Sequence, residues 1–232
     1  MAWPGQAGRG EARQGFFPIT STQGDFEMAK KSENVASEPV LDAPPTMKPE
    51  IVVFNITGIS PLLQNNPAEF IGKDEDSGIT AGKKKYNDEE EAGLRVYHNE
   101  GGDFCHPTEA FHKSVVRAVT GRKFGKTSAP GIIRGSVFVI EDHSVILDAR
   151  GKPAKKYTID RRSVVIGKAR VLRCRPRWDE WRMKIALEID VAICDPDNVL
   201  SGLSLAGRTV GVGDYRPEKG GGFGRFTAEM VK

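Results

Sequence analysis

Residues 211–226 combine glycine, basic and aromatic residues in a pattern that suits contact with a chain of phosphates. Glycine adopts backbone angles that other residues avoid and lets another backbone approach closely, so its N–H groups can face phosphate oxygens. Lys and Arg add positive charge, and Tyr or Phe rings offer a surface for base stacking. An ordinary flexible turn is the competing interpretation. The residues expected to make the contacts are Tyr215, Arg216, Lys219, Gly221, Gly222, Phe223 and Arg225.

A second candidate surface is the basic region at residues 152–182. Eleven Lys and Arg residues against three acidic residues give this region a net charge of +8; the whole chain carries +3, so the remainder carries −5. Such segregation is typical of a face that binds a polyanion. A solvated charged face is the competing interpretation. The residues expected to hold phosphates are Lys152, Lys155, Lys156, Arg161, Arg162, Arg170, Arg173 and Arg175.

Two details of this basic region carry further expectations. Arg173 and Arg175 alternate onto one side of a strand, whereas Arg170 falls on the other, which indicates a bulge near residues 171–172. Trp178 and Trp181 flank a turn at Asp179 and Glu180. Their rings either stack bases or pack inside the protein, and the sequence does not separate the two.

Residues 121–127 resemble a phosphate-binding P-loop but fail two of its requirements. Three residues separate the glycines where four are required, and a helix precedes the segment instead of a strand. Nucleotide hydrolysis is therefore not expected. Contacts with phosphates are still expected from Lys123, Lys126 and Arg134.

The four histidines and three cysteines show no arrangement typical of a metal site. Cys105 and His106 are adjacent, but two ligands need two more that converge on the same point. No Ser-His-Asp triad or pair of carboxylates is apparent either. The sequence therefore predicts no metal, no cofactor and no catalytic residue.

Hydrophobic periodicity predicts the elements that position these side chains. Within residues 183–193 apolar and polar residues alternate, as in a strand with one buried face. The other expected elements are a strand at 50–57, a helix from His106-Pro107 to about Gly121, short strands at 136–140 and 144–147, a hairpin arm at 157–166, a strand at 168–174 paired with 183–193, a helix from Asp195 to about Leu205 and a strand at 225–231.

This order predicts an α+β protein with a ferredoxin-like or RNA-recognition-like core, an inserted β-hairpin and a C-terminal glycine-rich loop. Residues 1–49 lack apolar periodicity and are expected to be disordered. Residues 50–232 are expected to form a single domain. Within it, residues 64–103 are polar and charged, and we expect a mobile insertion there.

Three motifs resemble the RAMP proteins that form the backbone of CRISPR effector complexes, and their relatives. The motifs are the glycine-rich stretch 207–226, the start of the first helix at 106–117 with its terminal Arg117, and the strand end at 58–62. The resemblance implies an RNA-recognition-like core and a hairpin "thumb", which maps to residues 148–167. It also implies copies that assemble side by side along a guide RNA, or along single-stranded DNA in viral or plasmid relatives.

The expected function is therefore non-catalytic binding of single-stranded RNA or DNA by a helical or filamentous homo-oligomer, with other effector subunits as possible partners. Two alternatives stay open: a metal-independent endoribonuclease that uses His106 or His112, and a structural assembly protein whose basic face meets an acidic partner. No apolar run approaches the roughly 20 residues that span a bilayer. Three cysteines without a CxxC pair fit a reducing, cytoplasmic setting, and no membrane contact is expected.

Overall fold

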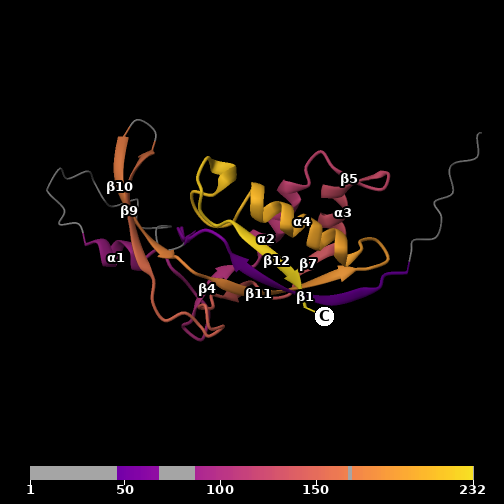
Figure 1. Ribbon diagram of the computed structural model, residues 1–232, viewed down its shortest axis with the longest axis horizontal. Helices are drawn as coiled ribbons and strands as arrows, with labels where there is room; N and C mark the ends of the chain where they lie inside the picture. Colours follow the sequence, from indigo (N-terminus) through magenta and orange to yellow (C-terminus); the bar gives the residue numbers. More distant parts are fainter. Residues whose placement is uncertain (1–45, 68–86, 167–168, 232) are drawn as a thin grey trace, which may run out of the picture. The chain divides into compact units, whose positions relative to one another are not determined.

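Figure 1 shows the computed structural model of the chain, which describes residues 46–67, 87–166 and 169–231. The described residues belong to one compact unit. Most of the segment expected to be disordered, residues 1–45, lies outside the described residues. Pro49, the last residue of the segment 1–49 that was expected to be disordered, is instead the first residue of the first strand.

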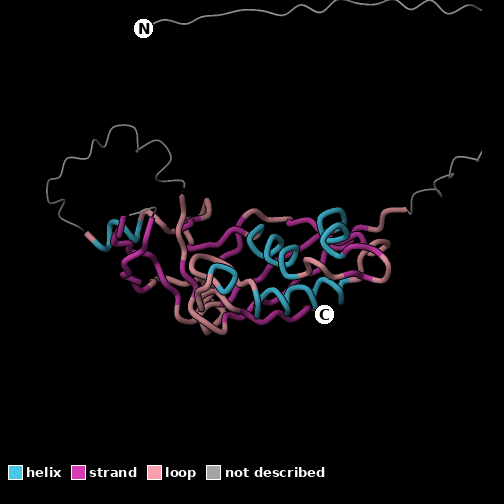
Figure 2. Tube along the Cα trace, turned by 90° about the horizontal axis from the view of Figure 1, so that it is seen from above, coloured by secondary structure: helices cyan, strands magenta, loops and turns pink. Residues whose placement is uncertain are grey.

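The largest sheet has the strand order β12-β1-β11-β7, and every neighbouring pair is antiparallel. Its strands are β1 (Pro49–Gly58), β7 (Val137–Val139), β11 (Arg182–Asp190) and β12 (Phe226–Met230). Two helices, α2 (Glu109–Ala118) and α4 (Pro196–Thr209), cover one face of this sheet (Figures 1 and 2). The α+β class expected from the sequence is confirmed.

The face of the sheet under the helices is apolar because the strand residues alternate between its two sides. Phe54 of β1 pairs with Ile185 of β11, and both are fully buried. Leu187 points the same way, whereas Lys184 and Glu188 are exposed on the opposite face. The alternation predicted for this segment is therefore confirmed over β11.

Local signals explain how the two helices begin and pack. The Asp195 side chain caps α4 by accepting a hydrogen bond from the Asp197 N–H at 2.8 Å, and Pro196 occupies the first turn, where its missing N–H costs least. Gly202 of α4 faces α2. A Cβ added there would lie 2.8 Å from Cγ1 of Val115, so the helices approach at a distance that favours glycine.

A second sheet carries the basic region, with the strand order β2-β10-β9. Its strands are β2 (Leu62–Leu63), β9 (Thr158–Ile166) and β10 (Ala169–Trp178). The expected pairing of residues 168–174 with 183–193 is wrong, since β10 pairs with β9 and β11 pairs with β1 and β7. Only two residues separate β9 from β10, so their pairing closes a shorter loop than the expected pairing would.

The hairpin therefore spans residues 158–178, whereas the thumb was expected at residues 148–167. Pairing runs without interruption from Ile166 opposite Ala169 to Thr158 opposite Arg177. The bulge expected near residues 171–172 is absent from this register.

Short elements fill the rest of the described chain. They are α1 (Asp88–Gly93), β3 (Tyr97–His98), β4 (Phe104–Pro107), β5 (Lys123–Phe124), β6 (Thr127–Ser128), α3 (Ala129–Ser136), β8 (His143–Val145) and the 3₁₀ turn η2 (Pro217–Lys219). Strands β3, β4 and β8 form a third sheet, and β5 pairs with β6. Among the described residues, no helix is long and apolar enough to cross a bilayer.

Within residues 64–103, where a mobile insertion was expected, the structure describes residues 64–67 and 87–103. Residues 87–103 form α1 and β3, and Val96 is buried. The Gln64 side chain is also fully buried, and its polar atoms are paired inside the protein. Its amide nitrogen donates to the Cys105 carbonyl, and its amide oxygen accepts from the Tyr97 N–H. Residues 68–86 lie outside the described part of the chain.

Candidate nucleic-acid interface

The glycine-rich loop between α4 and β12 is held against its own backbone. Gly213, Gly220 and Gly224 have positive φ angles of 76°, 77° and 66°. A Cβ at Gly224 would overlap the carbonyl oxygen of Val212, and one at Gly221 would overlap the carbonyl of Tyr215. These glycines therefore allow the loop to fold onto itself, so that its shape exists before any ligand binds.

Most backbone N–H groups of this loop bond within the protein. The Gly224 N–H donates to Pro61 at 2.7 Å, and the Asp214 N–H donates to Leu63 at 2.9 Å. The N–H groups of Gly221 and Phe223 donate to carbonyls of the loop itself. The expected cradle of N–H groups facing phosphates does not extend along the loop, so side chains must supply most ligand contacts.

Two aromatic rings of the loop form a pair in which Tyr215 is exposed and Phe223 is half-buried. The ring centroids of Tyr215 and Phe223 lie 6.0 Å apart, and Tyr215 is 42% exposed. Tyr215 has a positive φ of 49°, which is uncommon for a bulky residue and carries backbone strain. An exposed ring held at a strained residue is a feature found at binding sites.

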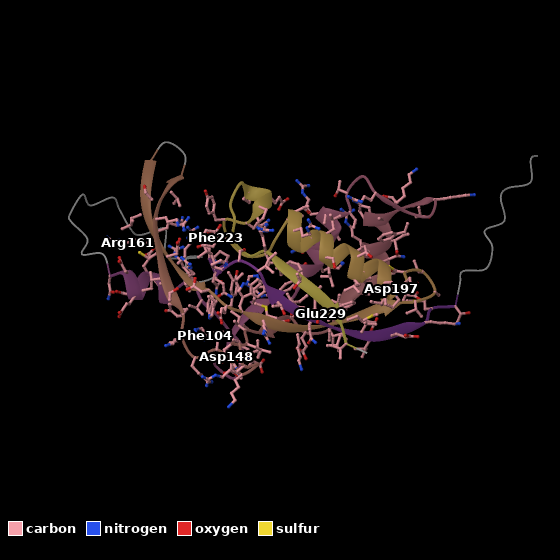
Figure 3. The ribbon with its side chains drawn as sticks, in the orientation of Figure 1. Phe104, Asp148, Arg161, Asp197, Phe223 and Glu229 are labelled. Carbon is pink, nitrogen blue, oxygen red and sulfur yellow. The ribbon has the colours of Figure 1, made fainter. Side chains whose placement is uncertain are left out.

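Arginines of the hairpin lie over this aromatic pair. The Arg162 guanidinium carbon lies 4.7 Å from the ring centroid of Phe223 and 5.9 Å from that of Tyr215, and Arg177 lies 5.9 Å from Phe223. Figure 3 shows Phe223 next to the hairpin that also carries Arg161. We call Arg162, Arg177, Tyr215 and Phe223 the stacking cluster.

A buried ion cluster ties the hairpin to the loop. The Arg175 guanidinium donates Nη1 to Asp214 at 2.8 Å and Nη2 to Asp160 at 3.1 Å, while Arg162 Nε donates to the other oxygen of Asp160 at 2.8 Å. Arg175 is only 3% exposed. Arg175 was expected to hold a phosphate, but both of its Nη groups face carboxylates of the protein itself, so neither is free for one.

The remaining basic residues at 152–182 differ in how exposed their side chains are and in whether an acidic side chain lies close to them. Arg161 is 57% exposed at 3.5 Å from Asp88, and Lys155 is 79% exposed at 3.2 Å from Asp103. Lys152 and Lys156 are exposed and Arg173 is half-buried. The expected contact at Arg170 concerns a side chain outside the described part of the structure.

The other loop residues expected to contact nucleic acid also differ in how exposed they are. Arg216 is half-buried and donates to Glu218 and to the Gly213 carbonyl. Lys219 and Arg225 are exposed, and so is Gly222, around which an added Cβ would meet nothing within 4 Å.

A separate basic group lies around α3 rather than beside the stacking cluster. Lys123 and Lys126 belong to the β5–β6 turn, and Arg134 to α3; all three are exposed. In Figure 1 these elements lie on the side of α2 and α4 away from the hairpin. The structure therefore does not bring these three residues together with the glycine-rich loop.

Trp178 and Trp181 are core residues. They are 3% and 1% exposed, and Trp181 Nε1 donates to the carbonyl of Ser60 at 2.9 Å. Trp178 packs against Phe104 and Tyr157. Of the two interpretations left open by the sequence, packing is confirmed.

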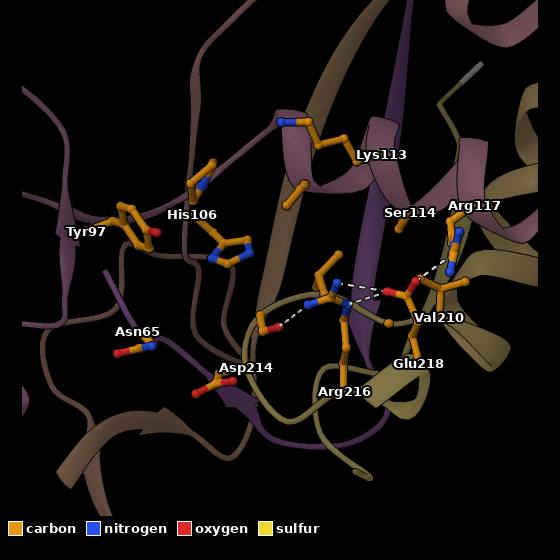
Figure 4. Close-up of a pocket in the computed structure, with 15 residues that line it drawn as sticks. Asn65, Tyr97, His106, Lys113, Ser114, Arg117, Val210, Asp214, Arg216 and Glu218 are labelled. Carbon is orange, nitrogen blue, oxygen red and sulfur yellow. Dashed lines mark hydrogen bonds and ion pairs between the residues drawn. The ribbon is translucent and has the colours of Figure 1, made fainter. Parts of the chain in front are cut away.

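A cavity of about 530 Å³ opens on the other side of the loop, between it, α2 and β4 (Figure 4). At one wall the Glu218 carboxylate accepts from Arg117 at 2.6 Å and from Arg216 at 2.8 Å. In the sequence, Arg117 stands out only through the family resemblance, and neither Tyr97 nor Glu218 was expected at a site. Their shared place at the cavity is set by contacts between distant segments, which leave no local signal.

His106 is a neutral, buried group. Burial, and to a lesser extent His143, lowers its pKa from 6.5 to about 3. A base that is unprotonated at neutral pH but so weakly basic is poorly matched to general base catalysis. His112 has its Nε2 3.5 Å from the Ile133 carbonyl. In the described part of the chain, no three His, Cys, Asp or Glu residues group in a way that could hold a metal ion.

No family model and no curated protein matches the chain. One solved structure to which it is similar is the crystal structure of Cmr6 from Pyrococcus furiosus, at 12% sequence identity and a TM-score of 0.43. The superposition covers 79% of this chain and all of the Cmr6 chain. A likeness this loose supports no functional argument, so function must be inferred from the residues themselves.

Proposed function

We propose that the chain binds single-stranded nucleic acid, and that the stacking cluster is where a base of the strand docks. The observation that carries this proposal is the exposed Tyr215 ring beside the half-buried Phe223 ring, with the Arg162 guanidinium carbon 4.7 Å from the Phe223 ring centroid. Aromatic rings flanked by guanidinium groups form a stacking platform that accepts any base. Duplex bases are already stacked and unavailable, so a single strand is the favoured partner.

Exposed basic side chains of the hairpin, of the segment before it and of the loop would hold the phosphates of the same strand. Arg161, Lys156 and Lys152 are exposed on or near the hairpin, and Lys219 and Arg225 are exposed on the loop. Neutralising phosphates releases counterions from the nucleic acid, which gives affinity without sequence preference. The buried Arg175 keeps hairpin and loop in register, so that rings and charges face one strand together.

We further propose that the core is ferredoxin-like. Along the chain, α2 comes between β1 and β7, and α4 comes between β11 and β12, which is the β-α-β-β-α-β order of that fold. In the sheet these strands have the order β12-β1-β11-β7. The motifs that resemble RAMP proteins favour copies that assemble side by side along RNA or single-stranded DNA. The stacking cluster does not distinguish RNA from DNA and does not require a partner subunit. Both RNA and DNA are therefore used in the test.

The test is a fluorescence anisotropy titration with 5′-fluorescein-labelled U20 and dT20, each also annealed to its complement. We expect tighter binding of the single strands. Tyr215→Ala and Phe223→Ala should each weaken that binding by about 1–3 kcal/mol. The matched control is Phe138→Ala, because Phe138 is also exposed (48%) but lies on the open face of the main sheet.

Two outcomes would count against the proposal. One is equal loss of affinity in the Phe138→Ala control and the two cluster variants. The other is an affinity that stays constant between roughly 50 and 200 mM salt, since phosphate contacts make binding strongly salt-dependent. Negative-stain images of the protein with and without U20 would test the assembly along a strand.

The proposal contains no catalytic step. His106 is held neutral inside the core, and His112 faces a backbone carbonyl. The alternative of a metal-independent endoribonuclease predicts defined cleavage of stem-loop RNA in EDTA, lost in His106→Gln or His112→Gln. The alternative of an acidic protein partner predicts that purified protein carries no nucleic acid.

A further inference from the structure

The cavity between the glycine-rich loop, α2 and β4 is a second site, separate from the stacking cluster. None of the four cluster residues lines it. Its volume of about 530 Å³ falls within the range of about 300–1,000 Å³ typical of small-molecule sites. The two sites share the same loop, because Gly213, Asp214 and Arg216 line the cavity while Tyr215 belongs to the cluster.

One end of the cavity is built for an anion. The guanidinium groups of Arg117 and Arg216 converge on the single carboxylate of Glu218, as the dashed lines of Figure 4 show. Burial raises the pKa of Glu218, but hydrogen bonds from Arg216 and Arg117 outweigh it and lower that pKa, so the group is ionised at neutral pH. The Arg117 side chain is 65% exposed and is therefore open to an outside anion.

The other end presents a neutral hydrogen-bond donor. The Gln64 amide nitrogen lies 3.2 Å from His106 Nδ1, and the Gln64 carbonyl accepts from the Tyr97 N–H, which fixes the orientation of the amide. Since the amide nitrogen donates, Nδ1 accepts, and the proton of the neutral imidazole is assigned to Nε2.

His106 Nε2 has no hydrogen-bond partner among the described residues, although the residue is only 4% exposed. Buried donors are rarely left unpaired in folded proteins, and such a group points to a missing partner. Figure 4 shows the imidazole projecting among the side chains that line the cavity, and the ring centroids of Tyr97 and His106 lie 6.0 Å apart. A ligand group that enters the cavity could supply the missing acceptor.

We propose that this cavity takes one nucleotide of the bound strand, with its phosphate at Arg117 and Arg216 and its base beside His106 and Tyr97. This inference rests on the proposed function, because the strand that stacks on Tyr215 passes the adjacent cavity. A nucleotide matches both ends: the phosphate suits paired guanidinium groups, and base carbonyls or ring nitrogens accept from a neutral N–H.

Glu218 is then an internal competitor for the phosphate. Its carboxylate occupies both arginines while the cavity is empty, so an incoming phosphate must displace it. Replacing Glu218 with Gln removes the competing charge but keeps a similar shape. The control is Glu188→Gln, which changes the net charge equally at an exposed residue on the open face of the main sheet.

The experiment titrates the full chain with fluorescein-labelled dT12 and U12, and with abasic 12-mers that keep the phosphates but lack bases. Glu218→Gln should tighten binding of all probes by about three- to fivefold, whereas Glu188→Gln should change binding far less. Arg117→Gln should weaken binding of all probes, compared with Lys184→Gln on the open face of the sheet. His106→Gln should weaken only the base-bearing probes, and thermal melts identify any variant that does not fold.

A second readout does not depend on variants that fold poorly. In the wild-type chain, the His106 imidazole Nε2–H should shift in a ¹⁵N-correlated NMR spectrum when dT12 is added, and should not shift with the abasic 12-mer. Identical responses to the two probes would overturn the inference.

The outcomes separate this inference from the proposed function. If Tyr215→Ala weakens strand binding while Glu218→Gln and Arg117→Gln match their controls, the cavity proposal fails and the proposed function stands. If no strand binds the wild-type chain, both fail. If dTMP or UMP fills the cavity and shifts His106 while the 12-mers do not, the site belongs to a free nucleotide and the strand assignment is overturned.

Discussion

The loop at residues 211–225 and the turn at residues 121–127 have similar compositions but different environments. Both mix glycine with Lys or Arg and an aromatic residue. In the first, glycines pack against carbonyls and most N–H groups bond internally. In the second, Gly121 and Gly125 have positive φ angles, but nothing lies within 4 Å of an added Cβ.

This difference teaches that glycine and positive charge together do not define a binding site. The turn at 121–127 is a short connection that displays Lys123 and Lys126 to solvent. The loop is a scaffold, held by the buried Arg175 and Asp214, that presents Tyr215 and Phe223 at a fixed spacing. Four sets of variants test this contrast between the loop and the turn.

The largest effect is expected from adding a methyl group to a packed glycine. Gly224→Ala should lower the free energy of unfolding by about 4 kcal/mol or more, because the Cβ overlaps the Val212 carbonyl at a positive φ. Gly125→Ala meets open space and should cost only about 1–2 kcal/mol for its positive φ. Urea unfolding measures both, and equal losses would show that the loop is no more constrained than the turn.

The next effect concerns the buried ion cluster. Arg175→Met leaves Asp160, which is 6% exposed, with Arg162 but without its Nη2 partner, and should cost about 1–3 kcal/mol. Arg134→Met on α3 removes an exposed charge of the other basic group and should change stability by less than about 0.5 kcal/mol. A neutral Arg175→Met would mean that loop and hairpin keep their register without this cluster.

A pH dependence follows from His106 under the loop. Its pKa is about 3 in the folded protein and near 6.5 in the unfolded chain, so the unfolded state binds the proton first. Its contribution to stability is complete above pH 6.5 and is lost by about 1.4 kcal/mol per pH unit as the pH falls toward 3. Urea unfolding from pH 7 to 4.5 should show a shallower decline for His106→Gln than for the wild-type chain, whereas Lys126→Gln should leave the decline unchanged.

The smallest effect is expected from the turn itself. If Lys123 contacts a phosphate, Lys123→Gln should reduce the slope of log K against log salt by about 0.7. The loss should be the same for base-bearing and abasic strands, because the contact involves charge alone. Tyr215→Ala should affect only base-bearing strands, and a base-dependent effect of Lys123→Gln would remove the distinction between the two regions.

Several elements of this protein could be predicted from the sequence because their signals are local. Alternation predicts β11, the Asp195-Pro196 pair predicts the start of α4, and the glycine-rich stretch predicts an unusual loop before the last strand. The α+β class follows from the order of these elements. The exposed residues Tyr215 and Arg225 could also be predicted as candidates, because polar and charged residues tend to lie at the surface and Tyr is intermediate.

Only the tertiary structure decided which strands pair, which arginine is buried and where the cavity lies. Arg173, Arg175 and Arg177 are equivalent in the sequence pattern, yet Asp160 and Asp214 hold Arg175 inside the protein. Asp214 is 39 residues away from Arg175, and Glu218 is 101 residues away from Arg117. Contacts over such separations depend on how the whole chain packs, and no local pattern of residues encodes them.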